Sequence, residues 1–233
     1  MKIYWDTFKE KFKRHKKPLF PSGSRVYKGF QGQGKTLSMV QYAFYIQKLC
    51  PKAVIFSNIL IKGLNNYHYF NDSKGLCEAI SYQNGLDGVL VLIDEAHLFF
   101  NKKDGISLDV LTAISQQRKD LRRLVFSSQI WEELDISLRK QVKEIVSCNC
   151  FLGFLQINLV TDGETLTYDK LKSEYVAKKI RFEIFKHNEK LYNAYSTRQK
   201  IINNLEYKRE MSGSPPPVGA AHLYLTNNKG TII

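Results

Sequence analysis

The chain has 233 residues, 43% of them hydrophobic, which is enough for one α/β core with peripheral additions. It carries 35 Lys and Arg against 22 Asp and Glu, a net charge of +13 that favours a polyanionic partner, either nucleic acid or an anionic membrane surface. No stretch approaches the ~20 apolar residues of a membrane span, and the N-terminus lacks the apolar core of a signal peptide. The four cysteines have no zinc-site spacing, which indicates reduced thiols in a cytosolic protein.

Residues 1–20 are predicted to form a basic amphipathic segment. Ile3, Phe8 and Phe12 can share one side of a helix, and basic residues cover much of the rest. Such a helix would lie on a membrane, bind DNA, or pack on the domain by its aromatic side. The stretch "KPLFPSGS" then leads into a core that we expect over residues 21–187.

The core begins with the pattern of a phosphate-binding loop. "GFQGQGKT" matches G-x-x-x-x-G-K-[ST], between a predicted strand at 24–29 and a predicted helix at 35–49. Backbone N–H groups of such a loop, together with the helix N-terminus, attract an anion. Lys35 is expected to reach the β- and γ-phosphates of ATP, and Thr36 to ligate Mg²⁺. The remaining nucleotide contacts are expected from Gly29, Gln31, Gly32, Gln33, Gly34 and Leu37.

A second motif follows a strand near 53–58 and a helix near 73–83. In "GVLVLIDEAHLFF", the five apolar residues Val89 to Ile93 predict a strand buried on both faces of a parallel sheet. Asp94 then stands at its carboxyl end, where open α/β sheets bind ligands. We expect Asp94 to hold Mg²⁺ and Glu95 to act as the base that orients the attacking water.

The rest of the core continues the alternation. A helix near 107–119 precedes the strand "RRLVFSSQ", Arg122 to Gln129, followed by a short helix near 131–140. Further strands are predicted with a turn at Asp162-Gly163. A helix near 188–208 and a flexible tail are expected within residues 188–233. Strands alternating with helices predict a mainly parallel sheet flanked by helices.

The letters "DEAH" at Asp94 to His97 also mark one class of helicases, but those need two tandem ATPase lobes and this chain holds one. One lobe leaves the γ-phosphate open on its outer side, so a motor of this kind would act as a ring in which a neighbour supplies an arginine finger. Gln129, at the end of a parallel strand, is placed to contact the γ-phosphate or the attacking water. A polar strand-end cap is the alternative for Gln129.

Three segments together resemble the FtsK–HerA superfamily of DNA-pumping ATPases: "GFQGQGKT", "LIDEAH" and "QQRKDLRRLVFSSQ". Within that superfamily, "IFSNILIKGL", "SLRKQV" and "LYNAYSTRQ" are similar to segments of zonula-occludens-toxin-like (Zot) proteins of filamentous phages and of viral packaging ATPases. The resemblance implies a RecA-like P-loop NTPase core. It also implies that Arg118 is the finger acting on a neighbour's site and that Gln129 senses hydrolysis, with Arg122 and Arg123 as competitors for the finger. A basic helix end stabilised by the helix dipole is the plain alternative for these arginines.

The resemblance implies a function in virus assembly, most simply a genome-packaging ATPase that works as a homo-oligomeric ring on nucleic acid and meets capsid portal proteins. Zot proteins usually continue into a membrane span and an outer domain, which this sequence does not show, so packaging is favoured over export. The expected location is the host cytoplasm or the virion, or the periphery of the inner membrane. "FNKKDG", Phe100 to Gly105, is a candidate pore loop or a solvated turn.

Three other functions remain open. A membrane-associated phage assembly and export ATPase would use residues 1–17 as its surface anchor. A P-loop small-molecule kinase would be a monomer without DNA stimulation, and Glu95 next to Asp94 suits water attack better than transfer to an alcohol. A non-catalytic adaptor would bind nucleotide only for assembly.

Overall fold

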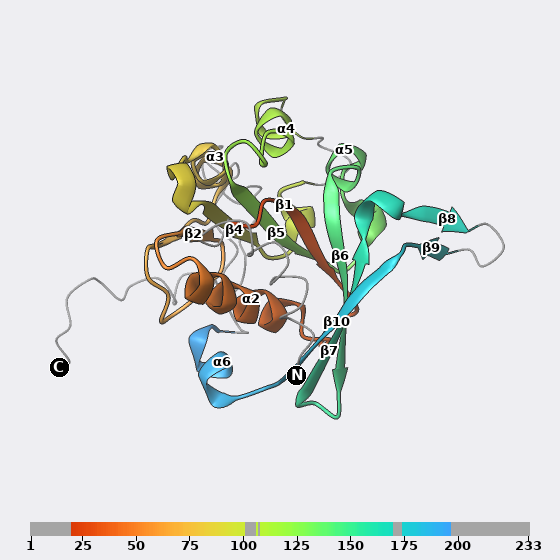
Figure 1. Ribbon diagram of the computed structural model, residues 1–233. Coiled ribbons are helices and arrows are strands. Elements are labelled where there is room, and N and C mark those ends of the chain that lie inside the picture. Colours follow the sequence, from red (N-terminus) through yellow and green to blue (C-terminus); the bar gives the residue numbers. More distant parts are fainter. Residues whose placement is uncertain (1–19, 101–105, 107, 170–173, 197–233) are drawn as a thin grey trace, which may run out of the picture. The chain divides into compact units, whose positions relative to one another are not determined.

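The computed structural model describes residues 20–100, 106, 108–169 and 174–196 (Figure 1). The predicted basic segment, the candidate pore loop beyond Phe100 and the predicted tail lie outside these residues. In chain order, the helices and strands are β1 (Gly23–Lys28), α2 (Lys35–Leu49), β2 (Val54–Ser57), β3 (Tyr67–Tyr69), α3 (Ser73–Ser81), β4 (Val89–Ile93), α4 (Leu108–Ser115), β5 (Arg122–Ser128), α5 (Ile136–Arg139), β6 (Val142–Phe151), β7 (Leu155–Asp162), β8 (Thr167–Asp169), β9 (Glu174–Val176), β10 (Lys179–Lys186) and α6 (Glu189–Ala194). No helix in the described ranges is long and apolar enough to span a bilayer.

Eight strands form one sheet in the order β10-β7-β6-β1-β5-β4-β2-β3. The pairs from β6 through β1, β5, β4 and β2 to β3 are all parallel, as the sequence predicts. The pairs β6–β7 and β7–β10 are antiparallel and extend the sheet as a wing. Because β1, β4 and β5 run in one direction, their carboxyl ends reach the same edge of the sheet, and we call this the catalytic edge.

Two apolar cores cover the two faces of the sheet. On one face, Leu90, Leu92 and Val125 pack with α2 and α6; on the other, Val91 and Phe126 pack with α3, α4 and α5 (Figure 1). Side chains alternate between the faces because successive residues of a strand point in opposite directions. All five residues of β4 are buried, which confirms the strand predicted from its unbroken apolar run.

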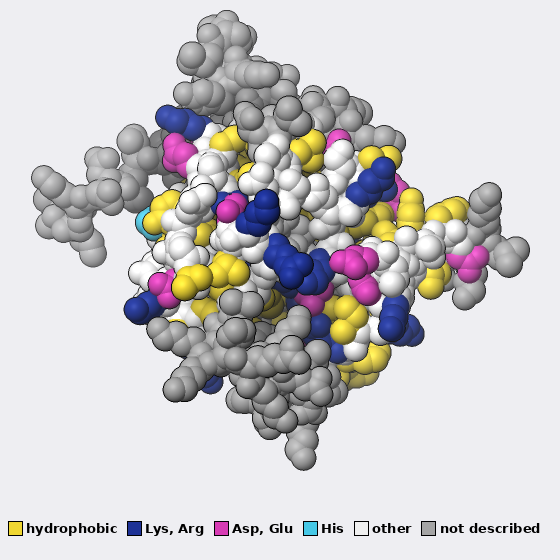
Figure 2. All heavy atoms as spheres, turned by 45° about the horizontal axis from the view of Figure 1, so that its top comes forward, with side chains coloured by type: hydrophobic (Ala, Val, Ile, Leu, Met, Phe, Trp, Pro, Cys, Tyr) yellow, Lys and Arg dark blue, Asp and Glu magenta, His cyan; other side chains and the backbone are white. Residues whose placement is uncertain are grey.

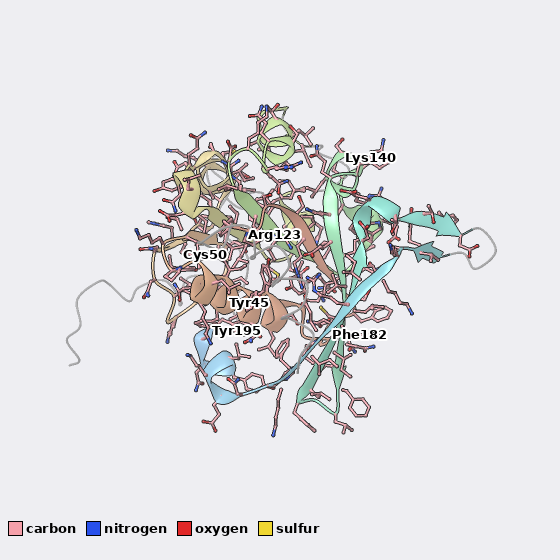
Figure 3. The ribbon with its side chains drawn as sticks, viewed as in Figure 1. Tyr45, Cys50, Arg123, Lys140, Phe182 and Tyr195 are labelled. Carbon is pink, nitrogen blue, oxygen red and sulfur yellow. The ribbon has the colours of Figure 1, made fainter. Side chains whose placement is uncertain are left out.

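A buried ion cluster joins the wing to the parallel core. Arg25 of β1 is fully buried, and its guanidinium donates to Glu144 of β6 at 3.1 Å and to Glu183 of β10. Arg123 of β5 and Arg181 of β10 bind the same Glu144 (Arg123 is labelled in Figure 3). A buried cation is stable only when it is paired and hydrogen-bonded, so these strands hold one another through the cluster.

The structure corrects several predicted boundaries. The turn between the long antiparallel strands is at Leu152 and Gly153, with φ of 51° and 73°, whereas residues 163–165 form a short 3₁₀ turn after β7. α4 ends at Ser115 rather than near residue 119. β3 and the β8–β9 hairpin were not predicted. Of the helix predicted near residues 188–208, the structure describes α6, which ends at Ala194 because Tyr195 forms an antiparallel bridge with Ile61, and residues 197–208 lie outside the described residues.

Candidate functional site

The predicted phosphate loop connects β1 to α2 at the catalytic edge. Gly32 and Gly34 have φ of 80° and 76°, a backbone conformation that glycine adopts without a Cβ penalty. Gly34 is also required by space, since a Cβ there would lie 2.1 Å from Oε1 of Gln156 on β7. The loop is therefore pressed against the wing, and Gln156 donates from Nε2 to the Gln33 carbonyl at 2.9 Å.

Lys35 is the first residue of α2 and only 6% exposed. Its ammonium folds back over the loop and donates to the carbonyls of Gly29 at 3.0 Å and Phe30 at 3.1 Å. The positive charge thus lies inside the ring of backbone that the sequence predicts to surround phosphate. An anion bound there would compete with two neutral carbonyls for this ammonium.

Thr36 and Asp94 meet at the catalytic edge, although 58 residues separate them. The Thr36 hydroxyl lies 3.0 Å from Oδ2 and 3.2 Å from Oδ1 of Asp94. The Ser127 hydroxyl, from β5, donates to Oδ1 of Asp94 at 2.6 Å. Asn58 holds the backbone of Asp94 by two bonds, accepting from its N–H at 2.7 Å and donating to its C=O at 2.9 Å.

Burial raises the pKa of Asp94, and the neighbouring Glu95 adds to this shift, while hydrogen bonds from Ser127 and Thr36 oppose it. A bound cation would favour the ionised carboxylate. Carboxylate and hydroxyl oxygens are hard ligands that suit Mg²⁺. Among the described residues, no group of three or more His, Cys, Asp or Glu could hold a metal ion by itself.

Glu95 follows in a left-handed conformation, φ 51°, which is uncommon for a residue with a side chain. Its backbone N–H donates to the Ser127 hydroxyl at 2.9 Å, and its Oε1 accepts from Nε2 of Gln129 at 2.9 Å. Oε2 is buried without a hydrogen-bond partner; it lies 3.3 Å from Nδ1 of His97, outside hydrogen-bond geometry. One oxygen of the carboxylate is therefore held and the other is left to accept a proton donor.

These groups line a cavity of about 670 Å³, a size typical of small-molecule sites. Of the predicted site residues, the cavity is lined by Gln31, Gly32, Gly34, Lys35, Thr36, Leu37, Asp94, Glu95 and Gln129. Gly29 and Gln33 lie behind it: Gly29 accepts from Lys35, and Gln33 accepts the backbone N–H of Cys150 at 2.9 Å. The structure thus brings the lysine-bearing loop and the paired acids together around one space.

Several residues of the site were not predicted. Asn58 and Ser127 position Asp94. The cavity is also lined by His187, which follows β10, by Tyr192 of α6 and by Tyr195, which follows α6. Burial raises the pKa of Tyr195 to about 12, and Asp94 adds to that rise; Figure 3 shows Tyr195 on the α2 side of the sheet. The sequence did carry signals for some of them: Ser127 is a polar residue inside the buried strand "RRLVFSSQ", and the segments "IFSNILIKGL" and "LYNAYSTRQ" contain Asn58, Tyr192 and Tyr195.

The three candidate arginines lie before or at the amino end of β5, opposite the edge that carries Gln129. Arg122 is 1% exposed and donates to the Tyr82 carbonyl at 3.0 Å and to Asp120 at 3.2 Å. Arg123 is 4% exposed and binds Glu144 and the Tyr42 hydroxyl. Arg118 is exposed on the turn after α4. Both competitors are therefore fixed inside their own chain.

Comparison of this fold with solved structures supports the sequence resemblance. The N-terminal domain of zonular occludens toxin from Neisseria meningitidis superposes with a TM-score of 0.54 and 21% identity, over 75% of this chain and 99% of that one. The genome packaging NTPase B204 from Sulfolobus turreted icosahedral virus 2, in complex with AMPPCP, superposes with a TM-score of 0.50 and 14% identity, over 69% and 99%. No family model matches the sequence, and no curated protein matches it.

At 21% and 14% sequence identity, the likeness to these structures establishes the fold of this chain and not its activity. The chain has the RecA-like P-loop NTPase fold that its sequence predicts, with a mainly parallel sheet flanked by helices. The predicted resemblance to Zot and packaging ATPases is confirmed at this level.

Proposed function

We propose that this chain is an ATP-hydrolysing nucleic-acid translocase for virus assembly, most simply a genome-packaging ATPase that acts as a homo-oligomeric ring. The observation that carries the proposal is the convergence of Lys35, Thr36, Asp94, Glu95 and Gln129 on one cavity at the catalytic edge. Its likeness in fold to a protein described as a genome packaging NTPase directs the choice among motors of this fold.

Each residue has a role in the proposed hydrolysis. The loop amides and Lys35 bind the β- and γ-phosphates, while Thr36 and Asp94 would hold Mg²⁺, which supplies charge neutralisation between the phosphate oxygens. Glu95 accepts a hydrogen bond from the attacking water through Oε2. It takes up the water's proton as the new bond to the γ-phosphorus forms and the bond from that phosphorus to the bridging oxygen breaks, which leaves ADP and phosphate. Gln129 fixes the carboxylate through Oε1 and senses the state of the γ-phosphate.

We infer that charge on the transition state needs a second cation beside Lys35, supplied by a neighbouring subunit. Among the described residues that line the cavity, Lys35 is the only lysine or arginine. A neighbour's Arg118, exposed in the monomer, fits the part of the finger; such a residue is worth ~10³–10⁵ in rate. This is the reason for proposing a ring.

The proposed nucleic-acid partner is gripped through its phosphates, without sequence preference, in the host cytoplasm or the virion. Figure 2 shows a group of basic side chains near the centre of one face, with acidic side chains beside it and further single basic side chains toward the rim. Capsid portal proteins are the proposed second partner.

A phage assembly and export ATPase at the inner membrane is the second candidate, supported by the likeness to the zonular occludens toxin domain. Binding to vesicles of anionic phospholipid that is lost on deleting residues 1–17 would favour it.

The experiment that tests the main proposal measures ATP hydrolysis with and without single- and double-stranded DNA and RNA, at low and high salt, beside a native mass measurement. We expect stimulation by a nucleic acid that high salt weakens, and a mass that is a multiple of the chain. A strict monomer that hydrolyses ATP without any nucleic-acid effect would exclude the motor.

A further inference from the structure

The cavity has two chemically different ends, because β5 and β4 lie on one side of β1 in the sheet and β6, β7 and β10 lie on the other. One end carries Asp94, Glu95 and Gln129, which suit water and a cation. The opposite end is closed by the β6–β7 turn, with Cys150 and Gly153, and by the chain that leaves β10, with His187 and Tyr192. The end with His187 and Tyr192 has ring side chains and no carboxylate, whereas the other end has two carboxylates.

His187 and Tyr192 form a fixed pair. Nδ1 of His187 lies 2.7 Å from the Tyr192 hydroxyl, and the two rings are 5.7 Å apart at an interplanar angle of 85°. Tyr192 as a whole residue is nevertheless 48% exposed, so it still has area to offer a ligand. Side chains held by hydrogen bonds lose little conformational freedom when a ligand binds.

A chain of hydrogen bonds connects this pair to the phosphate loop. Nε2 of His187 lies 3.2 Å from Oε1 of Gln156, which is fully buried. The amide nitrogen of Gln156 is already donated to the Gln33 carbonyl and to Asn158, each at 2.9 Å. The oxygen of Gln156 must therefore accept, so Nε2 of His187 carries the proton and Nδ1 accepts from Tyr192. Burial lowers the pKa of His187, in agreement with a neutral ring.

We propose that His187 and Tyr192 hold the nucleobase of the nucleoside triphosphate whose phosphates the loop binds. The inference rests on the proposed ATP site and adds the recognition of its base. A triphosphate seated at Lys35 and Thr36, with its last phosphate toward Asp94 and Glu95, directs its nucleoside to the opposite end of the cavity. The uncharged ring of Tyr192 there stacks on a purine or a pyrimidine, because every base has a π-face, and His187 holds that ring in place.

A base that is held by stacking, without hydrogen bonds to its edge, is recognised by the size of its ring rather than by its functional groups. The larger ring of a purine covers more of Tyr192 than a pyrimidine does, while adenine and guanine are distinguished weakly. The site is therefore inferred to prefer purine triphosphates over pyrimidine triphosphates and to accept both ATP and GTP.

The test compares a non-hydrolysable ATP analogue with inorganic tripolyphosphate, which has no base, by calorimetric titration of the full chain. Tyr192→Ala is expected to weaken binding of the analogue about tenfold and to leave tripolyphosphate unchanged. Tyr192→Phe keeps the ring and should retain the analogue. Tyr168→Ala, on the remote β8 strand and similarly exposed at 53%, is the matched control and should change neither.

Two results would overturn the inference and leave the ATP site standing: unchanged analogue binding in Tyr192→Ala, or an equal loss for both ligands, which would assign Tyr192 to loop support through His187. A wild-type chain that binds neither ligand would overturn the proposed function together with the inference.

Discussion

The side-chain amide of Gln129 donates to Oε1 of Glu95 at 2.9 Å and leaves Oε2 of the same carboxylate buried without a hydrogen-bond partner. An amide in place of that carboxylate keeps the shape but cannot take up a proton. We expect Glu95→Gln to lower kcat by ~10²–10⁴ and to leave ATP affinity near the wild-type value. Single-turnover hydrolysis and nucleotide titration of the same preparation measure the two quantities.

Gln129→Ala serves as the graded control, because it removes the partner of Oε1 and keeps the base. Its kcat should fall by less than that of Glu95→Gln. Wild-type turnover in Glu95→Gln would contradict the assignment and favour a protein that binds nucleotide only for assembly.

Asp94 is expected to reduce the stability of the ligand-free protein. Its folded-state pKa is raised by burial above the ordinary 3.8, so the contribution of this group to the unfolding free energy falls as pH rises from 3.8 through the raised value. Asp94→Asn removes the buried charge and should raise Tm at pH 7 without ligand. The same variant should lose the further rise in Tm that magnesium and ATP give the wild type, because a neutral amide is a poor ligand for Mg²⁺.

Differential scanning calorimetry with and without magnesium and ATP checks both parts. Ser128→Ala is the matched control, since this buried serine donates to the Ile130 carbonyl at 2.9 Å and not to Asp94. A ligand-induced rise in Asp94→Asn equal to that of the wild type would remove Asp94 from the metal site.

Local signals were sufficient for the phosphate loop and for β4. The spacing of three glycines before Lys35 fixes a backbone shape, and an unbroken apolar run needs burial on both faces, so both could be predicted without knowledge of the rest of the chain. The turn at Leu152 and Gly153 carries no Asn-Gly or Asp-Gly signal, so the true hairpin was missed. The end of α6 depends on Tyr195 pairing with Ile61, a contact of long range.

The part of the site around Gln156, His187 and Tyr192 could not be predicted either, because it also depends on contacts between residues far apart in the sequence. Gln156 reaches the Gln33 carbonyl across 123 positions of sequence, and Arg25 reaches Glu183 across 158. A polar residue in a strand is expected to face solvent when only the sequence is known, and it is the placement of β7 between β10 and β6 that buries Gln156 beside the phosphate loop. Sequence reasoning therefore found the residues of the phosphate loop and the paired acids that line the cavity, and it did not assign roles to the residues that support them.

The buried ion cluster should make the fold sensitive to acid. Burial alone would raise the pKa of Glu144, but Arg123, Arg25 and Arg181 hold it well below the ordinary 4.5. A carboxyl with a lowered pKa stabilises the fold above 4.5 and loses that contribution as pH falls toward the folded-state value. We expect the unfolding free energy of the wild type to fall below pH 4.5.

Glu144→Gln should cost about 3–5 kcal/mol at pH 7, because three arginines lose their shared anion, and should flatten the dependence below pH 4.5. Urea unfolding at several pH values measures both effects. Glu164→Gln, at an exposed position after β7, is the control and should behave as the wild type. A Glu144→Gln variant with the same pH profile as the wild type would show that other groups control the acid transition.

Gly34 and Gly32 offer a matched pair of substitutions in the phosphate loop. Both have positive φ, so alanine is strained at either position by ~1–2 kcal/mol. At Gly34 the added Cβ also meets Gln156, whereas at Gly32 it meets nothing within 4 Å. Gly34→Ala should therefore lose more stability and more nucleotide affinity than Gly32→Ala. Equal losses of stability, measured as Tm, and of nucleotide affinity, measured by titration, in the two variants would mean that the contact with Gln156 contributes nothing to either.

Arg118 is expected to act on a neighbouring subunit. Arg118→Ala should keep ATP binding and Tm, because the side chain is exposed, but lower kcat by ~10³ or more if it is the finger. Lys35→Ala should lack phosphate binding and yet still present its own Arg118. Mixing the two inactive variants forms hybrid rings in which an intact phosphate loop meets an intact arginine, so activity should return in the mixture.

Arg122→Ala and Arg123→Ala supply the contrast. Each removes a buried, hydrogen-bonded guanidinium, so each should lower Tm strongly and should not be rescued by mixing with Lys35→Ala. Mixing two inactive variants restores activity only when the active site lies between two chains. An arginine that acts within its own chain cannot restore the activity of a neighbour. A mixture of Arg118→Ala and Lys35→Ala that stays inactive while hybrid rings are present by native mass would place the missing positive charge elsewhere than Arg118.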